Sequence, residues 1–274
     1  MGMVEEHLRH ITRRNLRPST ITQRRRALVR LGRSLDLSRA TTEQIEDWLD
    51  SRNMGPAARA CEISHIRGFY KWAVAEGRLR HDPTIRLVRP KQARRLPRPM
   101  PEGDLRMAVE LAPEPIRSML MLAAFAGLRA CEIAGLCGEH IMRDQGVILV
   151  ADDKGGGMSS VPLAPDLEPT IRRLPQSGRC FLLTDGRPMA PHNVSHWCNR
   201  FLHSIGITHT LHALRHRFGT ACYEASGRDL RATQELLRHR SPVSSAIYTW
   251  VSPGHLADAV ARLPPVSQQE RLPW

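Results

Sequence analysis

Apolar residues recur every three to four positions over the first third of the chain, a spacing that predicts amphipathic helices. One helix is predicted to begin near Ser19, whose hydroxyl suits an N-cap. Its apolar positions share one face and comprise Ile21, Leu28, Leu31 and Leu35. Arginine fills many of the other positions, so this helix is expected to pack on one side and to present positive charge on the other.

Two more helices follow with the same periodicity. Thr41 and Gln44 have the spacing of a capping box at the start of the first. Pro56 suits the first turn of the second helix, and Gly77 suits its end. The inner stripe of this second helix comprises Ile63, Ile66, Tyr70, Ala73 and Val74.

The composition changes near residue 85. Residues 85–99 are rich in Arg and Pro and lack apolar periodicity, so they are expected to form an extended basic linker. This boundary predicts a helical domain over residues 1–84 and a second domain over residues 100–274. A chain of 274 residues is long enough for each of the two domains to bury its own core.

The second domain mixes helical and strand patterns. An apolar helix is predicted from about Pro115 to Phe125, followed by a stop at Gly127. Residues 146–150 and 159–163 have the pattern of two strands on either side of an Asp- and Gly-rich turn. The predicted fold class is therefore mainly α with a small antiparallel β-sheet (α+β).

Positive charge is concentrated in the first part of the chain. Residues 1–99 hold 22 Lys and Arg against 10 Asp and Glu, whereas the remainder holds 18 against 17. So local an excess favours a polyanion, most simply nucleic acid, although each single charge could equally belong to a solvated helix face. The cations expected to face outward toward DNA phosphates are Arg24, Arg25, Arg26, Arg30, Arg59, Arg67, Lys71, Lys91, Arg94 and Arg95.

The sequence also limits where the protein acts. No run of 18 apolar residues predicts a membrane span, and the first 14 residues lack the apolar core of a signal peptide. The expected location is therefore the cytoplasm. Six cysteines form no C-x-x-C pair and are expected to be reduced, buried thiols.

The second domain contains the side chains needed to attack a phosphodiester. Arg129, His212, Arg215, His239 and Tyr248 supply two arginines, two histidines and a hydroxyl nucleophile without a carboxylate pair. Such a set suits metal-free attack, because cations stabilise both the phenolate and the transition state. Alone, each residue also has a structural interpretation: Arg129 and His239 as helix caps, and Tyr248 as a packing residue.

A metal site is the alternative for two of these histidines. His212 and His216 are spaced four apart on a predicted helix, as two zinc ligands would be. Ala213, however, stands where a zinc-protease motif has Glu, and the sequence shows no third ligand. His212 and Arg215, three apart, are instead expected to project from one helix face toward one phosphate.

The order and local sequence of these segments resemble the tyrosine recombinases, the family of phage integrases and Xer-type recombinases. Residues 126–133 are similar to the family's first arginine box, residues 212–216 to the second and residues 237–250 to the third. The resemblance covers most of the chain. It implies a helical core-binding domain and a tyrosine-recombinase catalytic domain that clamp a duplex from two sides.

The resemblance implies a role for each candidate catalytic residue. Arg129 and Arg215 would bind the nonbridging phosphate oxygens, His212 would act as acid and base, and His239 would donate a hydrogen bond to the phosphate. Tyr248 would be the nucleophile. The family usually has Gly where this chain has Arg238, which predicts a differently shaped left-handed helix stop before His239.

Lys154 is unusual in a chain with 37 arginines and three lysines. A lysine is needed where a proton must be released, because a guanidinium effectively does not titrate. Lys154 lies near the tip of the predicted hairpin. By resemblance it matches the family's hairpin lysine, the general acid for the leaving 5′ oxygen.

The activity implied by the resemblance is site-specific DNA recombination by an integrase that lacks a separate arm-binding domain. DNA would be cleaved and rejoined through a 3′-phosphotyrosine and a Holliday junction, by a tetramer, without metal or ATP. The alternatives are a Xer-type dimer resolvase, a type IB topoisomerase and a non-catalytic DNA-binding repressor. The DNA target and any accessory proteins are not encoded in a recognisable form.

Overall fold

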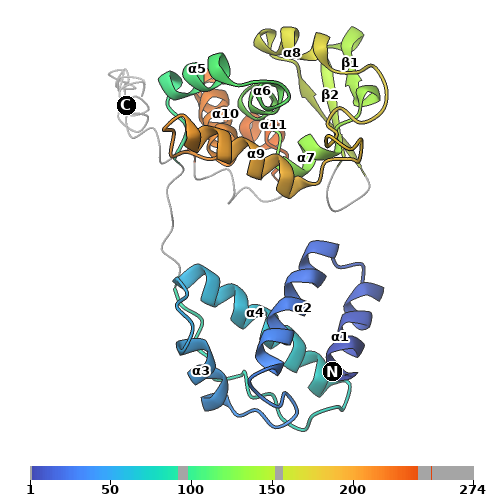
Figure 1. The fold of residues 1–274 in the computed structure, drawn as a ribbon, viewed down its shortest axis with the longest axis vertical. Coiled ribbons are helices and arrows are strands. Elements are labelled where there is room, and N and C mark those ends of the chain that lie inside the picture. The colour runs from blue at the N-terminus through green and yellow to red at the C-terminus, as the bar shows by residue number, and fades with distance from the viewer. Residues whose placement is uncertain (1, 92–97, 152–156, 240–247, 249–274) are drawn as a thin grey trace, which may run out of the picture. The chain divides into compact units, whose positions relative to one another are not determined.

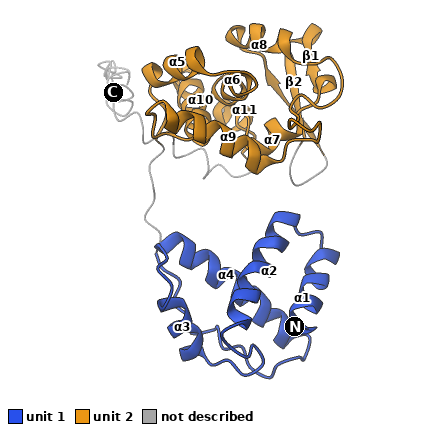
Figure 2. Ribbon diagram, viewed as in Figure 1, with its two compact units in different colours: residues 1–94 blue, residues 95–274 orange. Residues whose placement is uncertain are grey.

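The computed structural model describes residues 2–91, 98–151, 157–239 and 248. The chain divides into two compact units, residues 1–94 and residues 95–274 (Figure 2). The division falls inside the segment that the sequence analysis assigns to a linker. We call these parts unit 1 and unit 2, and describe each by itself.

Unit 1 is helical. Its helices are α1 (Gly2–Arg13), α2 (Pro18–Gly32), α3 (Thr42–Asp50) and α4 (Pro56–Ala75), coloured blue to cyan in Figure 1. Helices α1, α2 and α4 pack against one another, and α3 adds its apolar side to the same core. The largest fully buried side chains of this core are Leu28, Leu31, Ile45, Leu49, Ile63, Ile66, Phe69 and Tyr70.

The helix ends of unit 1 test the predicted caps. At α3, the Thr41 hydroxyl accepts a bond from the Gln44 backbone N–H at 3.3 Å, and the Gln44 side-chain oxygen accepts one from the Thr41 backbone N–H at 3.0 Å, so the predicted capping box is confirmed. Gly77 has a positive φ of 64° directly beyond α4, as expected of a helix stop. The predicted cap at Ser19 is wrong: α2 begins one residue earlier, at a proline.

Unit 2 contains seven α-helices within its described residues, together with three short 3-10 turns. The α-helices are α5 (Glu102–Leu111), α6 (Ile116–Phe125), α7 (Ala130–Gly135), α8 (Glu168–Arg173), α9 (Pro191–Ser204), α10 (Leu211–Ala225) and α11 (Leu230–Leu236). Helix α6 is mostly buried and packs on both α9 and α10, while α7 packs on α9. The C-terminal helices thereby hold the turn after α6, where Arg129 lies.

A small antiparallel sheet completes unit 2 (Figure 1). Its strands lie in the order β1 (Ile141–Met142), β2 (Val147–Ala151) and β3 (Met158–Pro162). The β2–β3 pair aligns Ile148 with Val161, and both side chains are buried. The predicted hairpin and the mainly α fold class are confirmed, and β1 is an addition that the sequence pattern does not predict.

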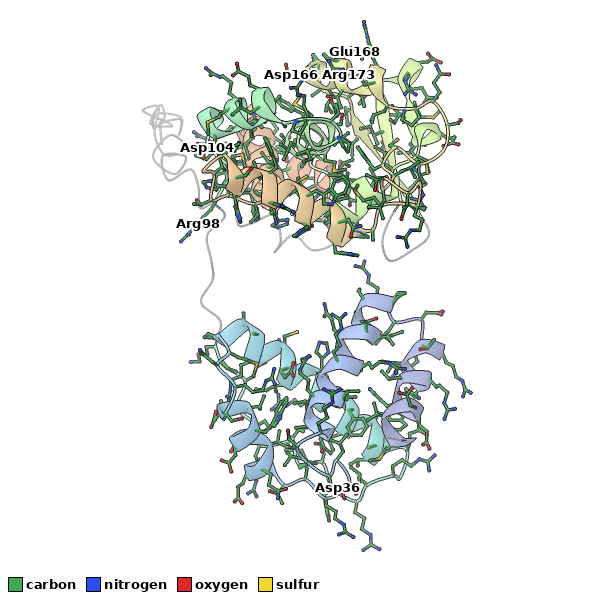
Figure 3. The ribbon with its side chains drawn as sticks, in the orientation of Figure 1. Asp36, Arg98, Asp104, Asp166, Glu168 and Arg173 are labelled. Carbon is green, nitrogen blue, oxygen red and sulfur yellow. The ribbon has the colours of Figure 1, made fainter. Side chains whose placement is uncertain are left out.

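Ion pairs at the edge of unit 2 lie on solvent-facing side chains. Arg173, labelled in Figure 3, is the last residue of α8, and its guanidinium lies 3.6 Å from the Glu114 carboxylate. Both partners are about half exposed, at 55% and 43% of the side chain. Among the described residues, no helix combines the length and apolar character needed to cross a membrane.

Candidate active site

The first part of the site is the turn between α6 and α7. Gly127 has a φ of 58°, and a Cβ at this position would overlap the Phe218 ring of α10. Glycine is therefore required both by the backbone conformation and by close packing. The turn places Arg129 as the residue before α7, with its side chain about one-third exposed.

Glu132 is the centre of an ion-pair cluster. Its carboxylate accepts bonds from the Arg129 amide at 2.8 Å and the Arg129 side chain at 2.6 Å, and from Arg238 at 2.8 Å. An Arg215 nitrogen lies 3.8 Å away. Burial raises the pKa of Glu132, but Arg238, the Arg129 amide, Arg215 and the Arg129 side chain outweigh it and leave that pKa below its usual value.

Arg215 connects the first turn to the last helix. It lies on α10, is 2% exposed, and donates bonds to the carbonyls of Gly127 and Leu237. Burial, with Arg129 and Arg238 nearby, lowers the pKa of Arg215 to about 9, so the group remains charged at neutral pH. As predicted, His212 and Arg215 occupy the same helix.

Arg238 corrects one sequence expectation. A different helix stop was predicted because the family usually has Gly here, yet Arg238 has a φ of 52° and keeps the left-handed conformation. Its side chain turns into the site, where it bonds to Glu132, to the Gly127 carbonyl at 3.1 Å and to the Leu236 carbonyl at 2.8 Å. The side chain is only 7% exposed.

Two histidine rings, His216 and His239, lie beside the nucleophile candidate, and His212 packs on His216. His212 and His216 lie edge to face with centroids 4.6 Å apart, and the His239 ring stacks beside Tyr248 at 6.5 Å. Burial lowers the pKa of His216 and of His239 to about 4, with nearby histidine and arginine charges adding to the effect. The His212 residue is exposed as a whole, but desolvation of its packed ring, followed by Arg215 repulsion, lowers its pKa also.

Tyr248 is buried against α10. It is 1% exposed, and its hydroxyl lies 3.4 Å from His216 Nδ1. Gly219 leaves room for the ring, because a Cβ there would lie 2.7 Å from the hydroxyl oxygen. Burial raises the pKa of Tyr248 to about 12, against the opposing pull of Arg215 and Arg129. In this arrangement the phenol is neutral and shielded from solvent.

The candidate DNA contacts of unit 1 differ in how firmly they are held. Arg25 bonds to exposed Glu5 at 2.9 Å, and Arg59 lies 2.6 Å from exposed Asp50. Arg30 makes a forked pair with the buried Glu62 carboxylate, at 2.8 and 2.9 Å. These pairs show that several of the predicted cations also stabilise the helical fold.

Arg67 was predicted to face outward, and this is wrong. Its guanidinium bonds to the carbonyls of Thr84 and Leu87, and so fastens the segment after α4. Arg24 is half-buried, with its guanidinium over Gly68 and 3.4 Å from a His7 ring nitrogen.

The other predicted DNA contacts divide into two groups. Exposed side chains are those of Arg26, Lys71 and Lys91. Arg94 and Arg95 lie outside the described residues, and so does Lys154, the predicted general acid.

Sequence reasoning missed three participants in the site. Glu132 follows Arg129 by three residues, which is the spacing of a capping box and was a usable signal. His216 was considered only as a metal ligand, and Arg238 only as a departure from glycine. The role of Arg238 had no local signal, because its carboxylate partner lies 106 residues away.

Comparisons with known proteins agree with this geometry. The model of the phage integrase family matches residues 89–255. Tyrosine recombinase XerD of Pseudomonas aeruginosa is 32% identical over 84% of this chain and 84% of that protein. The solved integrase of mycobacterium phage Brujita is 29% identical, with a TM-score of 0.51, over 98% of this chain and 94% of that chain. A lambda integrase tetramer bound to a Holliday junction shares the fold, with a TM-score of 0.71 at 18% identity, over 88% and 77%.

Proposed function

This chain belongs to the phage integrase family of tyrosine recombinases, and from this premise we propose that it cleaves and rejoins duplex DNA through Tyr248. It is a site-specific recombinase enzyme. The observation that carries the proposal is the convergence of three separate segments on one site. The turn after α6 brings Arg129, α10 brings Arg215 and His212, and His239 lies beside Tyr248.

In the proposed cleavage step, the Tyr248 oxygen attacks the scissile phosphorus while the bond to the 5′ oxygen breaks. The phenol proton passes to the His212 and His216 pair, of which His216 already lies 3.4 Å from the hydroxyl. Arg129 and Arg215 bind the nonbridging oxygens, whose charge grows in the transition state. The resulting 3′-phosphotyrosine conserves the energy of the phosphodiester, so rejoining needs neither ATP nor a metal ion.

Burial of Tyr248 sets a condition on this step. A hydroxyl in a residue that is 1% exposed cannot reach a DNA phosphate in this arrangement. DNA binding must therefore expose the phenol. The phosphate also supplies negative charge next to the three histidines, which raises their pKa values and makes proton transfer near neutral pH feasible.

We further propose Lys154 as the general acid that protonates the leaving 5′ oxygen. Lys154→Ala should then slow cleavage of ordinary DNA by about 10² to 10⁴-fold. A substrate with sulfur at the scissile 5′ position should remove most of that deficit, because a thiolate leaves without a proton. Arg129→Ala should stay defective on both substrates, since it acts on the nonbridging oxygens. An equal loss for Lys154→Ala on both substrates would exclude the general-acid role.

The central experiment is covalent trapping. The full chain is incubated with randomised or host-derived duplexes, denatured, and the attached DNA is sequenced. Wild-type protein should yield adducts on Tyr248 by mass spectrometry, whereas Tyr248→Phe should bind DNA and yield none. Adducts that persist in Tyr248→Phe would show that another residue is the nucleophile. Trapped sequences would also identify the target.

The proposed assembly is a tetramer that passes through a Holliday junction, as in the lambda integrase complex to which this fold is similar. A Xer-type resolvase acting in the bacterial cytoplasm is the second candidate, favoured by the identity to a Xer recombinase. Chromosomal dimer sites among the trapped sequences would support the resolvase. Phage or mobile-element attachment sites would support the integrase.

A further inference from the structure

Arg238 occupies a position where its backbone conformation favours glycine. Its φ of 52° lies in the left-handed region, which L-residues with a Cβ adopt at a cost in conformational energy. An arginine here therefore needs compensating contacts from its side chain. The structure provides them on three acceptors: the Glu132 carboxylate, the Gly127 carbonyl and the Leu236 carbonyl.

These acceptors belong to two different turns. Gly127 lies in the turn between α6 and α7, and Glu132 lies in α7, so the two residues flank Arg129. Leu236 ends α11, three residues before His239. A single planar guanidinium thus spans from the segment that presents Arg129 to the segment that presents His239.

Arg215 makes a parallel connection. It donates to the carbonyl of Gly127, which Arg238 also uses, and to that of Leu237, next to the acceptor on Leu236. The two guanidinium groups therefore hold the same two turns. Both side chains are nearly buried, at 3% and 7% exposure, and both donate to protein acceptors. Arg215 is assigned to the phosphate because it lies in the second arginine box, whereas Arg238 stands where the family usually has Gly.

We infer that Arg238 is a positioning residue of the cleavage site, which fixes Arg129 through Glu132 and fixes His239 through the end of α11. This inference rests on the proposed function for its effect on DNA cleavage. It does not depend on that function for its effect on His239, because the bonds from Arg238 to Glu132, Gly127 and Leu236 are made in the protein alone.

The first test is the rate of covalent adduct formation at saturating DNA, on a duplex recovered by trapping. Arg238→Gly suits the backbone conformation and should keep the fold, which circular dichroism checks. We expect DNA affinity to stay within twofold and the adduct rate to fall about 10- to 100-fold, as for misplaced reacting groups. Arg238→Lys retains the charge but not the forked bonds, so it should recover only part of the rate.

A matched control is Arg173→Ala, which removes an exposed guanidinium from the edge of unit 2 (Figure 3). It should leave the adduct rate at the wild-type value. A wild-type rate in Arg238→Gly, or complete rescue by Arg238→Lys, would overturn the bridging role.

The second test is NMR titration of His239 in the protein without DNA. Loss of the neighbouring cation should move the His239 pKa upward in Arg238→Gly and leave it unchanged in Arg173→Ala. Arg238→Lys keeps the charge but not the forked bonds, so a His239 pKa that also moves in Arg238→Lys reports displacement of the ring rather than loss of charge alone, and an unchanged one contradicts the positioning role. If wild-type protein forms no adduct, the proposed function fails, and this titration alone decides the inference. If wild-type protein forms adducts but Arg238→Gly matches it in rate and titration, the inference fails and the proposed function stands.

Discussion

Arginines are arranged differently in the two units. In unit 1, separate carboxylates serve separate guanidinium groups: Glu5 pairs with Arg25, Glu62 with Arg30, and Asp50 with Arg59. In unit 2, by contrast, three guanidinium groups share one carboxylate, that of Glu132. Those three are Arg129, Arg215 and Arg238.

The net charge of a region therefore does not show how its cations and carboxylates are arranged. Among the described residues of unit 1, at least four arginines each pair with their own carboxylate, and residues 1–99 still hold 22 cations against 10 acids. At the site, three cations and one carboxylate leave about two positive charges in a partly buried cluster. Such a cluster is costly without an anion, and in the proposed reaction a DNA phosphate would supply the missing charge.

Neutralising one carboxylate in each unit tests whether the shared carboxylate contributes more to stability than an unshared one. Glu132→Gln should lower the free energy of unfolding by about 3–5 kcal/mol, because it leaves buried guanidinium groups without an anion. Asp50→Asn, beside Arg59, should cost about 0–1 kcal/mol, since the Asp50 side chain is 68% exposed. Urea unfolding of the full chain measures both. Similar losses in the two variants would mean that the shared carboxylate is not special.

The second prediction uses the depressed histidine pKa values at the site. His216 and His239 titrate near 4 when folded and near the ordinary value of about 6.5 when unfolded. Between those pH values the unfolded chain binds more protons than the folded one, so the free energy of unfolding rises with pH. The contribution of these two histidines is therefore lost on acidification from about 6.5 to 4. Each ring is partly exposed, which limits its share to about 1–2 kcal/mol.

The measurement is urea unfolding at a series of pH values for wild type and His216→Asn. His7 of unit 1 also titrates near 4, so the wild-type curve alone does not isolate the site. The variant should show a shallower decline below pH 6.5. Superimposable declines would show that His216 does not become charged on unfolding in this range.

The sequence predicted those parts of the fold that depend on local patterns. The capping box at Thr41, the stop at Gly77 and the hairpin of β2 and β3 all follow from neighbouring residues. Helix α1 was not predicted, although Val4, Leu8 and Ile11 have helical spacing and form its buried stripe.

At the site, the sequence predicted residue types and order but not the network that holds them. Arg129, Arg215 and Tyr248 were predicted from their motifs, and the structure brings their segments together. The bonds from Arg238 to Glu132 and to the Gly127 carbonyl join residues more than 100 positions apart. No periodicity or spacing rule reaches that far, so only the folded chain reveals them.

The smallest effect concerns how unit 1 uses its cations. Lys71 is exposed on α4, whereas Arg67, one turn earlier, bonds to the carbonyls of Thr84 and Leu87. If Lys71 contacts one DNA phosphate, Lys71→Ala should reduce the slope of log affinity against log salt by about 0.9 and leave folding stability unchanged. Arg67→Ala should leave the slope unchanged and lower the free energy of unfolding by about 1–2 kcal/mol, because buried carbonyls lose their donor. Fluorescence anisotropy at several salt concentrations, with urea unfolding of the same variants, separates the two roles. A reduced slope for Arg67→Ala together with unchanged stability would show that its guanidinium leaves the carbonyls of Thr84 and Leu87 for DNA.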